Sequence, residues 1–269
     1  MRLWYQSLTR PGAWPAYNAA LRRMLEAAAD PGTEFTIGGI NQRGGVGDQY
    51  RSLEFIETIE VLENVAKADA EGYDAVLLGN IADPGLRQAR ELATVPVLGL
   101  CETALGLACQ MGHTVGLVVA NDKHFSRIQD NIALYGMGSR IACIERMQVD
   151  RLIDLDAAFR PGPVRERIIG QFLEGAAACV AKGAEVVVPA AGVAMVLVAD
   201  AGIHDAGRGV PVLNAAVALL KHGETVVKLN KLMGGRFVSR RGAYAQPPAE
   251  QIEELRAQYG AIFPRISAP

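Results

Sequence analysis

Short apolar runs alternate along this chain with longer segments that have helical periodicity. Apolar runs of about four to eight residues indicate strands, and their nearly continuous apolar character is typical of a parallel sheet covered by helices on both faces. The predicted strands are Arg2–Ser7, Glu34–Ile40, Asp74–Asn80, Val95–Leu100, Thr114–Ala120, Arg140–Met147, Glu185–Ala190 and Val210–Asn214. The predicted helices are Pro15–Ala28, Leu53–Ala70, Glu102–Met111, Lys123–Tyr135, Val164–Lys182 and Ala215–His222.

An internal repeat divides this α/β pattern into two units. The segment that begins Gly72-Tyr-Asp-Ala-Val-Leu-Leu recurs as Gly183-Ala-Glu-Val-Val-Val-Pro, and each copy leads through a short helical insert to Val-Pro-Val-Leu. Repeated units of this kind predict two lobes, each with a small parallel sheet. Ligands bind at the carboxyl ends of parallel strands, so we expect a site where these ends meet between the lobes. The strand-end positions are Gln6-Ser7, Asn80-Ile81, Cys101-Glu102, Asn121-Asp122 and Ala190-Ala191-Gly192.

Charge argues against a nucleic-acid partner. The chain has 269 residues, half of them hydrophobic, and a formal net charge of −2, without the basic face that would follow a phosphate backbone. Its densest basic stretch, Lys228 to Arg241, is interrupted by glycines and is typical of a solvated helix end and loop. A small-molecule partner is therefore expected, and the oligomeric state stays open, with a homo-oligomer among the options.

The sequence shows no recognisable targeting, membrane-spanning or metal-binding pattern. It has neither a signal-peptide pattern at Met1 nor an apolar run of about 18 residues, so a cytoplasmic protein without a membrane span is expected. Four cysteines without CxxC spacing indicate buried thiols in a reducing compartment. The histidines and cysteines show no metal-ligand spacing. The glycine-rich stretch 38–47 lacks a phosphate-loop ending and is predicted to be a flexible loop near the cleft.

The repeat segments also carry a family resemblance. The stretches Gly72 to Leu86, Val95 to Ala104 and Gly183 to Gly192 resemble the aspartate/glutamate/hydantoin racemase superfamily, and Asp83-Pro84-Gly85-Leu86 is most similar to its hydantoin and allantoin branch. The resemblance implies two pseudo-symmetric α/β lobes, no cofactor, and a small carboxylate or cyclic amide bound between them. It implies a first lobe of residues 1–99 plus 211–269 and a second lobe of residues 100–210.

Two cysteines that perform proton transfer in the family are replaced here. In the family, one thiolate removes the proton alpha to a carbonyl and the opposing thiol returns a proton to the other face, as inversion of a stereocentre requires. The resemblance aligns the first cysteine with Asn80 and the second with Ala191, or with Ala190 after a one-residue slip. Neither side chain has useful basicity. Asn80 could instead hydrogen-bond a substrate carboxylate or enolate oxygen, or serve as a turn residue.

Other residues near the predicted cleft have both a functional and a structural interpretation. Cys101 is the best-placed thiol, since a helix start lowers a thiol pKa, although cysteine is also common as a buried apolar residue. Asn121 is expected either to contact the ligand or to cap the next helix, and Gln6 and Ser7 either to bind substrate or to form a turn. His124 could act as an acid or base, with an exposed helical histidine as the alternative. Glu102 either matches the Gly-x-x-Glu pattern of the family or is an acidic residue in the first turn of a helix, where the helix dipole favours it. Gly192 is predicted to bind substrate.

Two classes of function remain open from the sequence. The first is a cofactor-independent isomerase or racemase that acts alpha to a carbonyl without paired cysteines, with a carbon–carbon lyase or decarboxylase as a variant. The second is a binding or sensing homologue that kept the cleft and lost the proton-transfer groups. Titratable side chains on each side of the cleft would distinguish the first class from the second.

Overall fold

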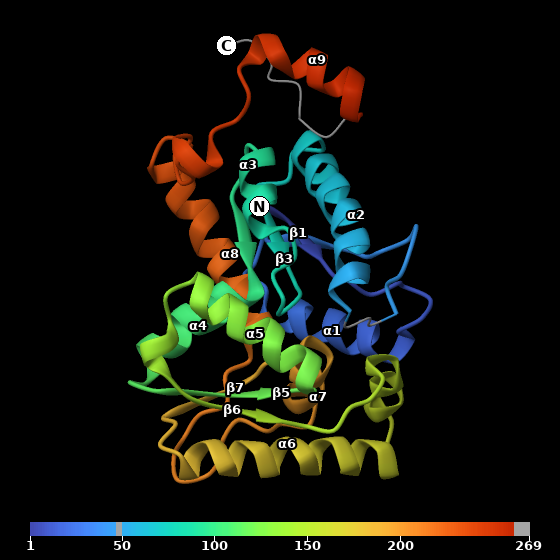
Figure 1. Cartoon of the computed structure of the whole chain (residues 1–269), viewed down its shortest axis with the longest axis vertical. Coiled ribbons are helices and arrows are strands. Elements are labelled where there is room, and N and C mark those ends of the chain that lie inside the picture. The colour runs from blue at the N-terminus through green and yellow to red at the C-terminus, as the bar shows by residue number, and fades with distance from the viewer. Residues whose placement is uncertain (47–49, 261–269) are drawn as a thin grey trace.

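Two separate parallel sheets form the framework of the protein (Figure 1). The computed structural model describes residues 1–46 and 50–260, so Gly47 of the predicted glycine-rich loop and residues 261–269 of the predicted first lobe lie outside it. The first sheet has the strand order β2-β1-β3-β4 and the second β6-β5-β7. The strands are β1 (Arg2–Gln6), β2 (Glu34–Gly38), β3 (Ala75–Leu78), β4 (Val97–Gly99), β5 (Val115–Val119), β6 (Ile141–Arg146) and β7 (Val186–Pro189).

Helices cover both faces of these sheets, as the apolar strands require. The α-helices are α1 (Pro15–Ala28), α2 (Arg51–Ala70), α3 (Leu86–Leu92), α4 (Leu100–Met111), α5 (Asp122–Leu134), α6 (Pro163–Ala181), α7 (Gly192–Asp200), α8 (Ala215–Leu232) and α9 (Ala249–Tyr259). Three short 3-10 helices lie at η1 (Gly138–Arg140), η2 (Leu152–Phe159) and η3 (Gly242–Tyr244). In Figure 1, α6 lies below the second sheet and α4 and α5 lie above it.

The repeat in the sequence corresponds to an equivalence between the sheets. β3 and β7 follow Gly72 and Gly183, and each pairs with the first strand of its sheet, β1 or β5. The short inserts after them are α3 and α7. The predicted strand Val210–Asn214 is wrong, because it makes only isolated bridges, one of them the parallel bridge from Val212 to Val187. Residues 211–213 therefore lie beside the second sheet, while the predicted lobe boundary itself stays a prediction.

Alternating side chains of the first sheet pack into two different cores. Trp4, Val76 and Leu78 belong to a cluster with residues of α2 and α3, whereas Leu3 and Leu77 belong to a larger cluster on the opposite face. Successive strand residues point to opposite faces, so both faces of this sheet are buried. The larger cluster also contains residues of β5, β7 and α8, and one continuous core therefore joins the two sheets.

Several boundaries differ from the sequence prediction because distant residues stabilise them. Helix α4 begins directly after β4, two residues before the predicted start, and α8 extends ten residues beyond His222. The Asp83 carboxylate accepts hydrogen bonds from the backbone N–H groups of Cys101 and Glu102 (both 2.9 Å) and so caps α4. Such a cap from outside the helix leaves no local signal in the sequence.

Candidate active site

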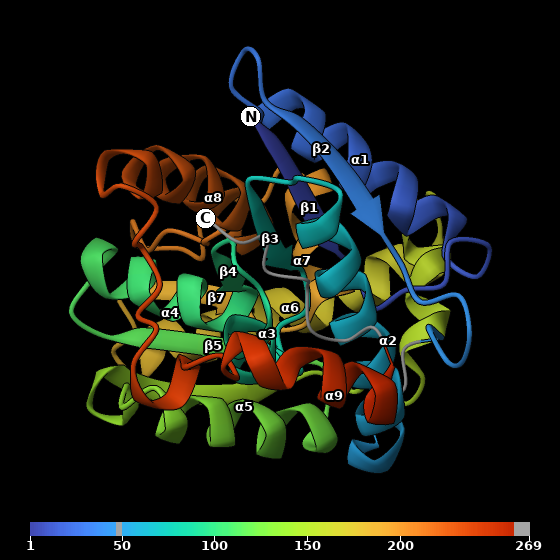
Figure 2. The same ribbon diagram turned by 90° about the horizontal axis from the view of Figure 1, so that it is seen from above.

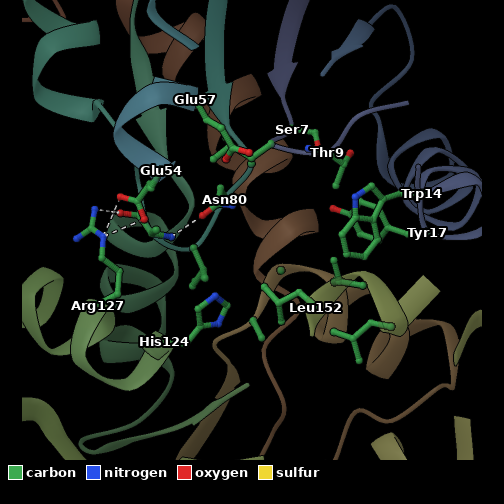
Figure 3. A pocket seen from close by; sticks show the side chains of 18 residues that line it. Ser7, Thr9, Trp14, Tyr17, Glu54, Glu57, Asn80, His124, Arg127 and Leu152 are labelled. Atoms are coloured by element: carbon green, nitrogen blue, oxygen red, sulfur yellow. Dashed lines mark hydrogen bonds and ion pairs between the residues drawn. The ribbon is translucent and has the colours of Figure 1, made fainter. Parts of the chain in front are cut away.

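A cavity lies between the carboxyl ends of the first sheet and the second lobe (Figure 3). In the predicted first lobe, the cavity is lined by the ends of β1 and β3 and by the start of α2. In the predicted second lobe, it is lined by the start of α5, by η2 and by the start of α7. Asn80 and Ala191, the two positions aligned with the family cysteines, both line this one cavity. The lining residues are Ser7, Leu8, Thr9, Trp14, Tyr17, Glu54, Glu57, Gly79, Asn80, Ile81, Ala82, His124, Arg127, Leu152, Leu155, Ala191, Gly192 and Val193.

Asn80 is both a turn residue and a source of hydrogen-bond donors at the cavity. Its Oδ1 accepts a hydrogen bond from the Ala82 backbone N–H (2.8 Å), which closes a turn after β3. Because this bond identifies the oxygen of the side-chain amide, the other terminal atom is the NH2 nitrogen. The preceding residue, Gly79, has no room for a Cβ atom because the Tyr5 ring occupies that space. The end of β3 therefore presents backbone and an amide NH2 group to the cavity.

The cavity also meets the N-terminus of α7. Ala191 is the N-cap residue of this helix and is buried, and no side chain caps the first turn. Gly192 lines the cavity, and a Cβ atom at this position would have no heavy atom within 4 Å. Backbone N–H groups and the positive end of the helix dipole favour a negatively charged or carbonyl oxygen here.

Two of the predicted site residues are used for structure outside the cavity lining. The Gln6 side chain is fully buried, accepts a hydrogen bond from Trp4 Nε1 (2.9 Å) and donates to the Ser7 carbonyl oxygen (2.8 Å). Asn121 caps α5 by accepting from the N–H groups of Lys123 and His124, and its amide donates to the Val149 carbonyl oxygen. Ser7, by contrast, lines the cavity, where its hydroxyl lies 2.8 Å from that of Thr9.

Cys101 is buried at the start of α4 and is not among the residues that line the cavity. The predicted effect of the helix start on its thiol is outweighed, because burial raises the pKa of Cys101 and the Asp83 carboxylate raises it further. Glu102, on the same turn, forms an ion pair with Arg90 instead of facing the cavity. Position at a helix start therefore does not give this thiol the environment of a reactive one.

His124 lies at the cavity, where the sequence left open either an acid–base role or an exposed helical position. It is not an exposed helical histidine: its imidazole lines the cavity, and Nδ1 is buried without a hydrogen-bond partner. Burial lowers the pKa of His124 to about 4, so the ring is neutral at physiological pH. A neutral imidazole has one nitrogen with a free lone pair, which can accept a proton.

The cavity lining also contains two carboxyl groups and one guanidinium, and none of the three was predicted from the sequence. The Glu54 carboxylate pairs with Arg127 Nε (3.1 Å), which joins α2 of one lobe to α5 of the other. Arg127 also donates to the Ala82 carbonyl oxygen (2.7 Å). Glu57 accepts a hydrogen bond from the Gly45 N–H (2.6 Å). The helical periodicity of α2 carries no signal for these roles, since charged residues on a helix are usually solvated.

Tyr17 faces the cavity from α1, on the side where Trp14 also lies (Figure 3). Burial raises its pKa to about 12, and a hydrogen bond with Ser7 opposes part of that effect. Among residues 1–46 and 50–260 there is no cluster of His, Cys, Asp and Glu that could hold a metal ion. Within the same ranges no helix is long and apolar enough to cross a membrane.

The two sheets and the cavity between them define a two-lobed α/β protein with a site for a small molecule. The chain belongs to the Asp/Glu/hydantoin racemase family, whose model matches residues 11–223. It is 29% identical over 208 residues to a hydantoin racemase of Pseudomonas sp. (strain NS671), covering 77% of this chain and 78% of that one. A hydantoin racemase of Rhizobium meliloti is 28% identical over 190 residues, 70% of this chain and 72% of the relative.

A solved structure supports the same fold over a greater length. The allantoin racemase from Klebsiella pneumoniae superimposes with a TM-score of 0.71 at 23% identity, covering 92% of this chain and 94% of that one. The predicted fold class, two small parallel sheets flanked by helices, is confirmed. The predicted superfamily and its hydantoin branch are confirmed by the family match and the two hydantoin racemases.

Proposed function

We propose that this chain is a cofactor-independent isomerase that inverts the carbon alpha to a carbonyl in a small carboxylate or a hydantoin-like cyclic amide, without a pair of cysteines. Family membership supports racemase chemistry in general. The proposal about the mechanism rests on one observation. Titratable side chains from both lobes, His124 on one side and Tyr17 and Glu57 on the other, line the same cavity, and no cysteine is among the described lining residues.

This observation favours an enzyme over a binding protein that has lost its proton-transfer groups. Abstraction of an alpha proton needs a base close to the carbon and hydrogen-bond donors close to the carbonyl oxygen. His124 offers the base, and Asn80 with the first turn of α7, from Ala191 and Gly192, offers donors. The apolar walls formed by Trp14, Leu152 and Leu155 strengthen these electrostatic interactions by excluding water.

Charge in the cavity favours the cyclic amide among the two substrate classes. The lining contains two carboxyl groups, Glu54 and Glu57, against one guanidinium, Arg127, which already pairs with Glu54. A dicarboxylate would bring two more negative charges into this space, whereas a hydantoin-like ring brings none. Its carbonyl oxygens and N–H groups can pair with Asn80, Ser7 and Thr9, and unpaired buried polar groups would otherwise be costly.

The test is loss of the alpha-proton signal in deuterated water, followed by NMR together with chiral chromatography. Separate enantiomers of 5-substituted hydantoins, allantoin, aspartate and glutamate are the substrates, and carbon dioxide release is measured in parallel. We expect exchange and inversion with at least one cyclic amide, at a rate well above that of the amino acids. Binding without exchange would contradict the proposal and indicate a sensing protein, and carbon dioxide release would indicate a decarboxylase.

A further inference from the structure

A buried imidazole nitrogen without a hydrogen-bond partner is unusual enough in a folded protein to require an explanation. Buried polar atoms are nearly always hydrogen-bonded, because an unpaired one costs free energy. His124 Nδ1 is one of three buried side-chain atoms without a partner in the described part of the chain, and the only one of the three that belongs to the lining of this cavity. A ligand in the cavity would supply the missing contact.

The geometry points to His124 as the catalytic acid and base of the second lobe in the proposed isomerase. Figure 3 shows its ring projecting from α5 toward the cavity, on the side where Asn80 also lies. The adjacent backbone is held in place, since Asn121 accepts a hydrogen bond from the His124 N–H (3.2 Å). The role rests on the proposed function, because it names the group that would perform that reaction.

The step begins with neutral His124, whose ring nitrogen with the free lone pair accepts the proton from the alpha carbon. The electron pair of the broken C–H bond moves into the carbonyl and forms an enolate, whose oxygen accepts hydrogen bonds from the Asn80 amide and the N-terminus of α7. Return of the proton by the imidazolium restores the starting enantiomer, so inversion needs a donor on the opposite face, which is the Tyr17 hydroxyl of the predicted first lobe. The imidazolium then releases its proton to solvent and the tyrosinate regains one. In deuterated water both groups exchange with solvent, so deuterium appears at the alpha carbon.

The surroundings of His124 suit this task. Glu54, Glu57, Arg127 and Tyr17 are the other titratable or charged residues of the cavity lining. Glu54 is paired with Arg127, and Glu57 accepts a hydrogen bond from the Gly45 N–H. Both carboxylates are therefore engaged in structural interactions, and His124 is the better candidate for the base. Because the pKa of His124 is lowered to about 4, the base is present in its unprotonated form throughout the physiological range.

Three variants test the role: His124→Gln, His124→Asn and, as a matched control, His113→Gln. His113 is an exposed histidine that does not line the cavity. General acid and base catalysis contributes about 100-fold to 10,000-fold. We therefore expect both His124 variants to lose at least about 100-fold in exchange rate, while calorimetric affinity for the substrate changes by less than about threefold and His113→Gln keeps the wild-type rate. In the wild type, the rate should be constant above about pH 5 and fall as the pH decreases through about 4, where His124 becomes protonated.

The outcomes separate this inference from the function on which it rests. Exchange by the wild-type protein that falls less than about tenfold in both folded His124 variants would overturn the role of His124 and leave the proposed function standing. A complete absence of exchange by the wild type with every substrate would overturn both. Circular dichroism and the affinity measurement establish that the variants are folded, and the two substitutions guard against a defect specific to one of them.

Discussion

At the scale of single residues, Asn80 makes two separable contributions through the two ends of its amide. Oδ1 accepts from the Ala82 N–H and maintains the turn after β3, whereas the NH2 group is available at the cavity. Asp at this position would keep the acceptor and remove the donors, and Ala would remove both. The two substitutions therefore distinguish a binding role from a turn role.

We expect Asn80→Asp and Asn80→Ala each to weaken binding of a cyclic amide by about tenfold or more. The reason is that loss of one hydrogen bond, with a substrate oxygen left unpaired, costs about 1.5 kcal/mol of binding free energy. Only Asn80→Ala should also lower the free energy of unfolding measurably, because it removes the acceptor for the Ala82 N–H. Calorimetry and urea denaturation measure the two effects. Unchanged affinity in the Asp variant would reduce Asn80 to a turn residue.

At the scale of elements, the loop after β3 and the start of α4 are joined by the carboxylate of Asp83. It is buried, accepts from the N–H groups of Cys101 and Glu102 and from the Tyr135 hydroxyl (2.7 Å), and has a positive φ of 48°. This accounts for the Asp-Pro-Gly-Leu motif in physical terms. The motif shapes the loop that carries Asn80, and it joins the predicted first lobe to two helices of the predicted second lobe, α4 through its backbone N–H groups and α5 through Tyr135 directly after it.

Asp83→Ala should lower the free energy of unfolding by about 2–4 kcal/mol, because buried donors lose their acceptor and alanine tolerates a positive φ poorly. Asp83→Asn should cost less, since one oxygen still accepts and asparagine adopts this backbone conformation more readily. The exposed Asp122→Asn serves as the control, with a change within about 0.5 kcal/mol in urea denaturation. Equal stability of wild type and Asp83→Ala would contradict the capping role.

The same residue predicts a pH dependence of stability. Burial raises the pKa of Asp83 to about 6, above its ordinary value of 3.8. The folded state therefore binds a proton at Asp83 more tightly than the unfolded state does. The resulting contribution to the free energy of unfolding is fully present below about pH 4 and is lost as the pH rises through about 6. Asp83→Asn should remove this part of the pH profile.

At the scale of the whole molecule, helices α2 and α5 are linked across the cavity by two ion pairs of different burial. Glu54 and Arg127 are each about one-fifth exposed, whereas the side chains of Arg51 and Asp130 are more than half exposed. Ion pairs at exposed positions contribute little, and a partly buried charge that loses its partner is costly. The two pairs therefore form a natural comparison within one interface between the lobes.

Double-mutant cycles on the two pairs test this link by urea denaturation. We expect a coupling free energy of about 0.5–3 kcal/mol between Glu54→Gln and Arg127→Met. The cycle formed by Arg51→Met and Asp130→Asn should give about 0.5 kcal/mol or less. A zero coupling for the inner pair would mean that the lobes are held together by the shared apolar core alone.

The amino-acid pattern by itself determined the fold class, the order of most elements and the equivalence of β3 and β7, because these depend on local periodicity and on a repeat visible in the sequence. It also brought Asn80, Ala191, Gly192 and Ser7 into view, since strand ends are sequence-local features. The roles of Gln6, Asn121 and Cys101 were decided only by the tertiary structure, where Trp4, the start of α5 and Asp83 engage them.

The same reason explains why the sequence left two interpretations of His124 open and predicted no role for Glu57. Each lies on a helix, where polar side chains are usually solvated, and only the packing of the two lobes buries Glu57 and the Nδ1 atom of His124 at one cavity. Val210–Asn214 shows the converse effect. Its apolar run has the composition of a strand, but with few backbone partners within reach it makes isolated bridges. Local pattern therefore specified the elements, whereas long-range packing specified which side chains meet and in what electrostatic environment.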